Sequence, residues 1–343
     1  MTTNTTLSAA RIAIIAIAVA ACLTLCCALP SQAQAADLQT AQASSTSKTL
    51  TTQKAKVYKI KTAAQWHNIG KYKGGTFKLM NNIALKSTSQ YLTINRKYAY
   101  TIDLNGKKIA TKYTGNAKRS APLVMKKGTV TVKSSQKNKG VLYSTEFFAV
   151  DVLGGKFYLE SGSIVDDYVD FRNDACSAIC VSNSAKCVLK GGKVRGVCNG
   201  VSVMDSASVY TQGSKTSPYI RAGAHDSTVA FTHFGSAINI ASRTAKLSLK
   251  GGSLGTKADP DAPSYSVVGT YYYTQSGHYP VLDMYGQALK QAKGYKFIDP
   301  SGNDVPIRQD ALNSTYPGAS PKTMLETWTK SSDGYYTVYV TKS

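Results

Sequence analysis

The side chains in this sequence that could do chemistry are densest in the stretch VDDYVDFRND, residues 165–174. The stretch contains four closely spaced carboxylates, those of Asp166, Asp167, Asp170 and Asp174. Ca²⁺ prefers oxygen ligands, which makes Asp166, Asp170 and Asp174 candidate metal ligands. Paired carboxylates also carry out glycoside hydrolysis, which makes Asp166, Asp167 and Asp170 candidate catalytic residues. The alternative interpretation is a solvated acidic loop between two structural elements.

Tyrosines are the candidates for sugar binding, because a tyrosine ring combines a flat apolar face with a hydrogen-bonding tip. The run Tyr271, Tyr272 and Tyr273 is the candidate ligand-binding segment, although packing within a strand is the commoner use of such a run. The sequence contains neither a nucleophile elbow nor a P-loop. Its four histidines are dispersed along the chain: His67, His225, His233 and His278.

The elements that must position these residues are short strands that recur along the chain. Residues 185–194 read AKCVLKGGKV and residues 245–254 read AKLSLKGGSL, with looser copies earlier in the sequence. Six positions of the repeat are equivalent and point inward: Leu104, Val132, Leu159, Leu189, Thr211 and Leu249. A repeat of roughly 20–30 residues with a short strand and a glycine turn is typical of a solenoid. We therefore predict an all-β, right-handed parallel β-helix, with a β-sandwich as the alternative.

Each coil of this helix is expected to carry more than one strand. A second apolar strand precedes the motif at residues 149–152, 177–181, 199–203 and 236–240. A further apolar residue follows the glycine turn and would begin the next side of the coil: Ile109, Ile164, Val194 and Leu254.

The four cysteines that follow residue 35 lie within the repeats. Cys176 and Cys198 are 22 residues apart, which places them one above the other in adjacent coils. Neighbouring strands lie about 4.8 Å apart, a separation that a disulfide tolerates. Cys180 and Cys187 flank one turn and are a second possible pair. Buried core thiols are the alternative for all four.

The two ends of the chain differ from the repeats. Residues 1–35 resemble a secretory signal peptide with a small-residue cleavage pattern, and a lipid anchor at Cys22 is the alternative. Residues 36–55 have the composition of a disordered spacer. A capping-box pattern at Thr62 predicts a short helix over residues 62–70 that covers the first coil.

These boundaries divide the mature chain into a β-helix over residues 56–257 and a C-terminal segment, residues 258–343. The C-terminal segment is predicted to be an α+β capping arm or a small module. Residues 284–293 are expected to form a short helix, and DPSGN at 299–303 a hairpin turn. No stretch after the signal is apolar for long enough to span a membrane.

Charge is the main indication of partners. The chain has a net charge of +22, and cleavage of the signal would remove only one charged residue, Arg11. A strongly basic exported protein attracts polyanions, here teichoic acid, anionic polysaccharide or host glycan. No motif for specific nucleic-acid binding is visible. Solvated lysines on outward strand positions are the alternative explanation.

The cap helix, the segments GGTFKLMNNIAL and YTIDLNGKKI and the L-x-G-G coils together resemble secreted right-handed β-helix proteins of Gram-positive bacteria. These belong to the pectate-lyase-like fold group. The resemblance implies the fold over about residues 56–257. It also implies that Asp166, Asp170 and Arg172 are the positions to test for lyase chemistry with bound Ca²⁺. Asp166-Asp167 only partly matches the polygalacturonase pattern, since the upstream Asn-x-Asp of that family is missing.

The sequence thus favours a secreted or cell-surface protein without catalysis that binds anionic polymers or glycans, as an adhesin does. A polysaccharide lyase or glycoside hydrolase on the same fold is one alternative, and a purely structural surface stalk is another. The oligomeric state is not indicated.

Overall fold

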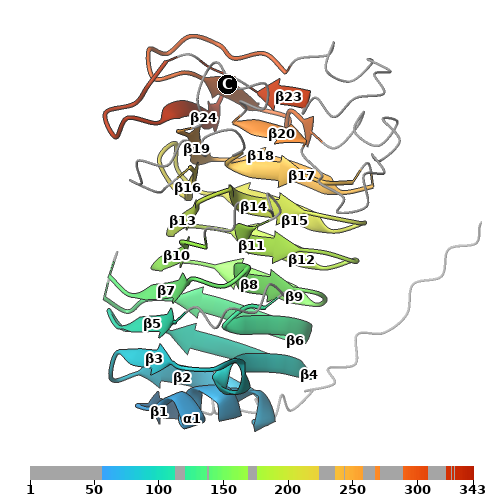
Figure 1. The fold of residues 1–343 in the computed structure, drawn as a ribbon. Coiled ribbons are helices and arrows are strands. Elements are labelled where there is room, and N and C mark those ends of the chain that lie inside the picture. The colour runs from blue at the N-terminus through green and yellow to red at the C-terminus, as the bar shows by residue number, and fades with distance from the viewer. Residues whose placement is uncertain are drawn as a thin grey trace, which may run out of the picture. The chain divides into compact units, whose positions relative to one another are not determined.

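A computed structural model of the chain describes residues 56–112, 120–136, 139–168, 176–223, 236–242, 244–257, 267–270, 289–307, 322–325, 327 and 329–343. These residues belong to one compact unit, Lys54–Ser343. The predicted signal peptide, lipid anchor and spacer lie outside the described residues. The described unit is a parallel β-helix, as the repeats predicted, and its strands stack in three columns (Figure 1).

Column one is formed by the second strand of each coil that the sequence predicted. Its members are β8 (Phe148–Val152), β11 (Ser177–Val181), β14 (Asn199–Val203), β17 (Ile238–Ile240) and β20 (Val268–Thr270). Neighbouring members pair in parallel. Every residue of β8, β11, β14 and β17 is buried, so this column is covered on both faces.

Column two carries the repeat motif itself. Its later members are β9 (Lys156–Leu159), β12 (Lys186–Leu189), β15 (Ser208–Gln212), β18 (Lys246–Lys250) and β21 (Leu289–Lys290). At the N-terminal end the column begins with β1 (Val57–Ile60) and β2 (Gly75–Leu79). Two long strands, β4 (Leu92–Asp103) and β6 (Leu123–Lys133), run through columns one and two without a break.

Column three completes each coil. It consists of β3 (Ile83–Leu85), β5 (Lys108–Thr111), β7 (Val141–Ser144), β10 (Ser163–Asp166), β13 (Lys193–Gly196), β16 (Tyr219–Ala222) and β19 (Gly252–Thr256). The predicted residues Ile109, Ile164, Val194 and Leu254 form its inward row and are fully buried. Leu142 and Ile220 fill the two coils that the sequence motif missed.

Glycine turns separate the columns once the long strands end. Gly155 lies between β8 and β9 with a φ of +78°, a conformation that L side chains rarely adopt. A Cβ atom there would also lie 2.3 Å from the carbonyl oxygen of Gly128 in the previous coil. This corner therefore requires glycine for both its backbone conformation and its close packing.

The inward residues of column two are stacked in register. Val132, Leu159, Leu189, Thr211 and Leu249 pair in sequence and have no exposed surface. The four apolar residues among them belong to one continuous hydrophobic core, and Thr211 is a buried polar residue in the same row. The interior predicted from the repeat is therefore confirmed for these coils.

The expected equivalence of Leu104 with Val132 is wrong. Ile102 is the residue that pairs with Val132, so the first repeat is two residues out of register. Leu104 is still buried, but it begins the turn that Asn105 and Gly106 make. A slip of two residues keeps the same face of a strand inward, and alternation alone therefore cannot detect it.

A short helix closes the N-terminal end, as predicted. Helix α1 (Ala63–His67) continues into the 3₁₀ helix η1 (Asn68–Lys71), and Trp66 and Ile69 are buried against the core. The Thr62 hydroxyl accepts a hydrogen bond from the Gln65 N–H at 3.2 Å. The Gln65 side chain in turn accepts one from the Lys61 N–H at 2.7 Å. A second 3₁₀ turn, η2 (Thr88–Gln90), lies beside α1.

The parallel columns continue beyond the predicted boundary at residue 257, because β20 and β21 of the C-terminal segment pair in parallel with β17 and β18. The later strands of the segment fold back on the last coils in antiparallel pairs. Strand β24 (Tyr336–Lys342) pairs with β19 on one side and with β22 (Tyr295–Ile298) on the other. Strand β23 (Lys322–Leu325) pairs with β20. The predicted turn at 299–303 forms, because the Asp299 N–H bonds to the Asn303 carbonyl at 2.8 Å.

The helix predicted for residues 284–293 is wrong where it can be tested. Leu289 and Lys290 form strand β21, and Leu289 pairs with Leu247 of the coil below. Packing on the column overrides the local helical preference here. The described residues of the C-terminal segment include strands but no helix.

Candidate functional site: a basic face on column two

The outward side chains of column two form a surface that we call the basic face. It comprises Lys133, Lys156, Tyr158, Lys186, Tyr210, Lys246 and Lys250 on strands β6, β9, β12, β15 and β18, together with Lys190, which directly follows β12. These strands lie one above another (Figure 1). Alternate residues along each strand are buried in the core, and the residues between them point outward. The repeat that builds the interior therefore also aligns these cations.

Strand pairing places the lysines in rows. Lys156 and Lys186 are direct partners in adjacent coils, and Lys246 lies two strands beyond Lys186 in the same row. Lys190 and Lys250 follow the inward leucines of β12 and β18, again two strands apart. Adjacent strands are roughly 4.8 Å apart, so cations in these rows repeat at about 5 or 10 Å.

Tyrosines stand beside the lysines on the same surface. The Lys186 ammonium lies 4.4 Å from the ring centroid of Tyr210, and the Lys190 ammonium lies 5.1 Å from that of Tyr158. Both rings are half-buried. A cation over an aromatic face is stabilised modestly at such sites, which restrains the lysines and leaves them charged.

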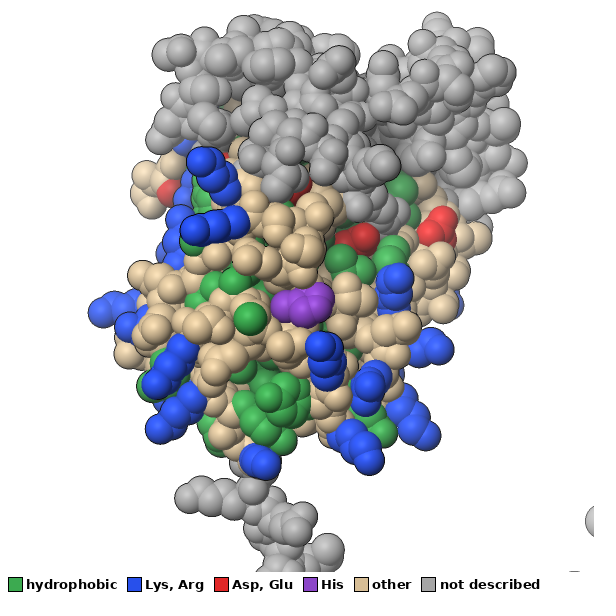
Figure 2. Space-filling view, turned by 60° about the horizontal axis from the view of Figure 1, so that its bottom comes forward, with side chains coloured by type: hydrophobic (Ala, Val, Ile, Leu, Met, Phe, Trp, Pro, Cys, Tyr) green, Lys and Arg blue, Asp and Glu red, His purple; other side chains and the backbone are tan. Residues whose placement is uncertain are grey.

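Acidic side chains do not balance this surface. Among the described residues, five acidic side chains are buried: Asp103, Glu146, Asp151, Asp166 and Asp299. Asp103 lies in register with Lys133, but it accepts hydrogen bonds from the N–H groups of Asn105 and Ser135, at 2.9 and 2.8 Å. The N-terminal end shows the same imbalance, with many Lys and Arg side chains and few acidic ones (Figure 2).

One exposed acid lies within the basic face. Glu160 forms an ion pair with Lys190 at 3.4 Å, and both side chains are more than 40 % exposed. Such pairs contribute at most about 1 kcal/mol, and salt weakens them. Lys190 therefore remains available to an external anion.

Of the acidic residues that the sequence grouped together, the structure describes Asp166 and Asp167, which are neighbours. Asp166 ends β10 and has no exposed surface, so it is not part of a solvated loop. Burial raises the pKa of Asp166 well above its ordinary value, the nearby Tyr168 N–H offsets this only in part, and the charges of Asp167 and Glu146 raise it further. Neither carboxylate oxygen forms a hydrogen bond of good geometry with a described residue.

Asp167 is half-buried next to Asp166 and faces Tyr143. Burial raises the pKa of Tyr143 to about 12, and the carboxylate of Asp167 adds to this rise. Asp170, Arg172 and Asp174 lie outside the described residues, as do Tyr271, Tyr272 and Tyr273. Within the described ranges, no three acidic, histidine or cysteine side chains converge on a common metal position.

The cysteines have two different arrangements. Cys176 and Cys198 form a disulfide between adjacent coils, and their Cα atoms are 5.7 Å apart. Cys180 and Cys187 are buried and do not form the second bridge considered from the sequence. Cys187 points into the core beneath the basic face, whereas the Cys180 sulfur contacts that of Met204 at 3.6 Å.

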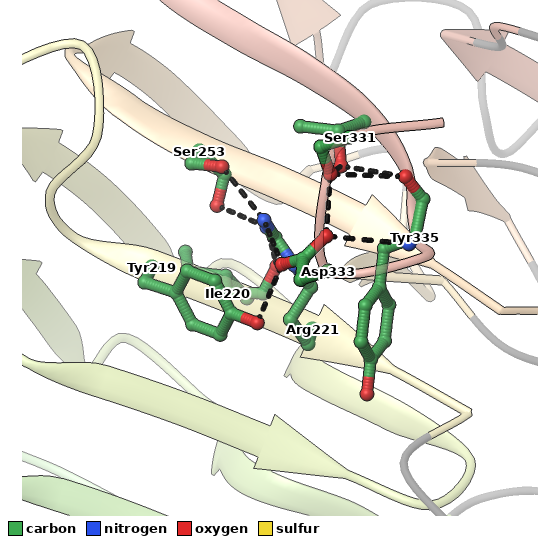
Figure 3. A network of polar contacts seen from close by, with 8 residues as sticks. Tyr219, Ile220, Arg221, Ser253, Ser331, Asp333 and Tyr335 are labelled. Atoms are coloured by element: carbon green, nitrogen blue, oxygen red, sulfur yellow. Dashed lines mark hydrogen bonds and ion pairs between the residues drawn. The ribbon is translucent and has the colours of Figure 1, made fainter. Parts of the chain in front are cut away.

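A second polar cluster, which sequence reasoning missed, joins column three to the C-terminal arm (Figure 3). The guanidinium of Arg221 is 2 % exposed and forms an ion pair with Asp333 at 3.1 Å. Arg221 also donates to the carbonyl and hydroxyl oxygens of Ser253, at 3.0 and 2.9 Å. The Tyr219 hydroxyl donates to Asp333 at 2.8 Å, and Ser331 donates to the other carboxylate oxygen.

The contacts of Asp333 with Arg221 and Tyr219 hold the turn before β24 against β16. The bonds from Arg221 to Ser253 connect β16 to β19. Burial alone would raise the pKa of Asp333, but hydrogen bonds from Ser331 and Tyr219 and the charge of Arg221 lower it to about 2. The cluster is therefore a structural lock. Arg221 and Asp333 are 112 residues apart, and no local motif marks the pair.

Comparisons with known protein families, with curated proteins and with solved structures found no match to this chain. None of the described helices is long and apolar enough to cross a membrane. The basic face is thus the functional feature that the described residues support best. Sequence reasoning found its charge, and the register of the columns gives that charge a position.

Proposed function

We propose that this protein is a secreted or cell-surface β-helix protein that binds anionic polymers or glycans without catalysis, in the manner of an adhesin. The observation that carries the proposal is the set of lysine rows on column two, where Asp103 is buried and hydrogen-bonded and Glu160 is an exposed acid paired with Lys190. Teichoic acid, anionic polysaccharide and host glycan are the partner classes, and no cofactor is required. Membership of the pectate-lyase-like group is part of the proposal.

Parallel stacking suits a repeating ligand. Lys156 and Lys186 stand one strand apart, and Lys190 and Lys250 stand two strands apart. A polymer lying along the column meets several ammonium groups at once, and weak contacts then add through multivalency. Tyr158 and Tyr210 offer partly exposed ring surface between them for a sugar face.

The test compares two triple variants of the mature chain that lose the same charge. Lys156→Ala/Lys186→Ala/Lys246→Ala removes one row of the basic face, whereas Lys86→Ala/Lys108→Ala/Lys112→Ala removes exposed lysines of column three. Binding to poly(glycerol phosphate) and to polygalacturonate is measured at low and physiological salt. Each lysine near an anionic surface contributes about 1 kcal/mol, so the face variant should lose on the order of 100-fold in affinity.

The control variant should lose much less, and wild-type binding should weaken as salt screens the charges. Equal losses in the two variants would show that net charge alone drives binding. Absence of binding to either polymer at low salt would contradict the proposal and leave the structural stalk. Ultraviolet-absorbing unsaturated products formed from polygalacturonate with Ca²⁺ would instead support the lyase alternative, for which Asp166, Asp170 and Arg172 are the residues to replace.

A further inference from the structure

At its C-terminal end the basic face runs into a hollow of about 260 Å³ that the polymer proposal does not use. The hollow lies between the turn that follows β15, the junction of β18 and β19, and strands β22 and β24. Its polar lining consists of Ser214, Lys215, Tyr295, Thr341 and Lys342. The floor includes Gly251, which directly follows Lys250 of the basic face. We call it the Lys215–Lys342 hollow.

The charges in the hollow are available to a ligand. Lys215 and Lys342 are exposed, and neither forms an ion pair with a described residue. The Lys215 ammonium lies 4.8 Å from the ring centroid of Tyr339, which restrains it and leaves its charge unneutralised. Two lysines that line one hollow favour an anionic ligand there.

The walls are held in place by the fold. Tyr295 and Lys342 are direct partners in the antiparallel pair β22–β24, and Val340 pairs with Gly252 of the last coil. Two backbone hydrogen bonds connect the turn after β15 to the coil. The Gly213 N–H donates to the Lys250 carbonyl oxygen at 3.1 Å, and the Gly252 N–H donates to the Ser214 carbonyl oxygen at 2.8 Å. The lysines therefore project from paired backbone on both sides.

We propose that the Lys215–Lys342 hollow binds one anionic, hydroxylated unit, a sugar acid or a polyol phosphate, at the end of a polymer lying on the basic face. The volume is just below the roughly 300–1,000 Å³ of small-molecule pockets, which suits one such unit and not an oligomer. The two ammonium groups pair with the anion, and the hydroxyls of Ser214, Thr341 and Tyr295 hydrogen-bond to ligand hydroxyls. This inference rests on the proposed function for the polymer but is tested with monomers.

The experiment titrates the mature chain with galacturonate and with glycerol 3-phosphate, using galactose and glycerol as neutral controls. Amide resonances of Gly213, Gly251 and Thr341 report binding in the hollow. The charged monomers should shift these resonances and the neutral ones should not. The stronger of the two charged monomers identifies the ligand class as carboxylate or phosphate.

Two double variants separate the hollow from the face. Lys215→Ala/Lys342→Ala should lower monomer affinity about tenfold, through loss of charge-assisted hydrogen bonds, and should largely retain polymer binding. Lys156→Ala/Lys246→Ala should weaken polymer binding and leave monomer binding unchanged. Equal effects of the two variants on monomer binding, or no shift at the hollow with either charged monomer, would overturn the inference even if the polymer binds. Monomer binding without polymer binding would instead contradict the proposed function alone.

Discussion

Two acidic residues beside column three, Asp166 and Asp333, show opposite uses of a carboxyl group in this molecule. Asp166 is fully buried and has no hydrogen bond of good geometry with a residue that the structure describes, and its pKa is raised. Asp333 is partly exposed, accepts bonds from Tyr219 and Ser331 and pairs with a buried arginine, and its pKa is lowered to about 2. A fully buried carboxyl group resists ionisation, whereas a partly exposed one with hydrogen-bond donors and a cation beside it stabilises the fold through its charge.

The largest expected effect is the loss of the partner of Arg221. Asp333→Ala leaves a guanidinium that is 2 % exposed without its carboxylate, and it should lower the free energy of unfolding by about 3 kcal/mol. Urea unfolding measures the loss, and hydrogen exchange should show it first in β24. Asp304→Ala is the control, because Asp304 belongs to an exposed ion pair with Lys296 that should contribute less than about 0.5 kcal/mol. Equal losses in the two variants would contradict the lock.

Replacing Asp166 should raise the free energy of unfolding, whereas replacing Asp333 lowers it. The raised pKa of Asp166 means that the folded state holds the proton more tightly, so stability falls as pH rises from about 4 through the folded pKa. Asp166→Asn removes this ionisation and should gain about 1–3 kcal/mol over wild type at pH 7, with the gain vanishing near pH 4. Unfolding curves between pH 4 and 8 decide this, with Asp304→Asn as control. A loss of stability at pH 7 would indicate that the ionised carboxylate has a partner.

Low pH should also weaken the pair of Arg221 and Asp333, because it protonates the Asp333 carboxylate. The lowered pKa of Asp333 stabilises the folded state above pH 4, and this contribution is lost as the pH falls from about 4 to about 2. The effect should be smaller than that of Asp333→Ala, since the side chain is 32 % exposed. In Asp333→Asn the melting temperature should depend less on pH across this range than it does in the wild type. An unchanged pH dependence in that variant would assign the acid sensitivity to other carboxylates.

The smallest stability effect is expected for Glu160, an exposed carboxylate with a single ion-pair partner. Glu160→Gln should change the free energy of unfolding by less than about 0.5 kcal/mol, because both members of the pair are solvated. It should nevertheless strengthen binding to an anionic polymer by removing the negative charge from the basic face. Parallel unfolding and binding measurements test both parts, and weaker binding would place the ligand elsewhere.

The sequence predicted the coils because each coil repeats the same pattern, an inward apolar residue followed by a glycine turn. The error at Leu104 arose where that signal is ambiguous, since a shift of two residues preserves the inward face. The helix expected near Leu289 failed because packing on Leu247 outweighed a local preference.

The candidate site was less accessible to sequence reasoning. Net charge pointed to polyanions, but only the strand register places Lys156, Lys186 and Lys246 in one row. The burial of Asp166 and the pairing of Arg221 with Asp333 depend on contacts between distant segments, which no local pattern reports. The two buried thiols could not be told from a second bridge, because closeness in sequence does not fix the direction of a side chain.

The antiparallel arm also determines how the stack of coils ends. A last parallel strand would expose N–H and C=O groups in the spacing that another parallel coil can continue, which is a route to open-ended assembly. In this protein β24 runs opposite to β19 and β22 runs opposite to β24, so the chain reverses direction twice beyond the last coil of column three. The end of that column no longer repeats the pattern of the coils beneath it. Column one ends in the same way, because β23 runs antiparallel to β20, so two of the three columns end in an antiparallel strand of the same chain.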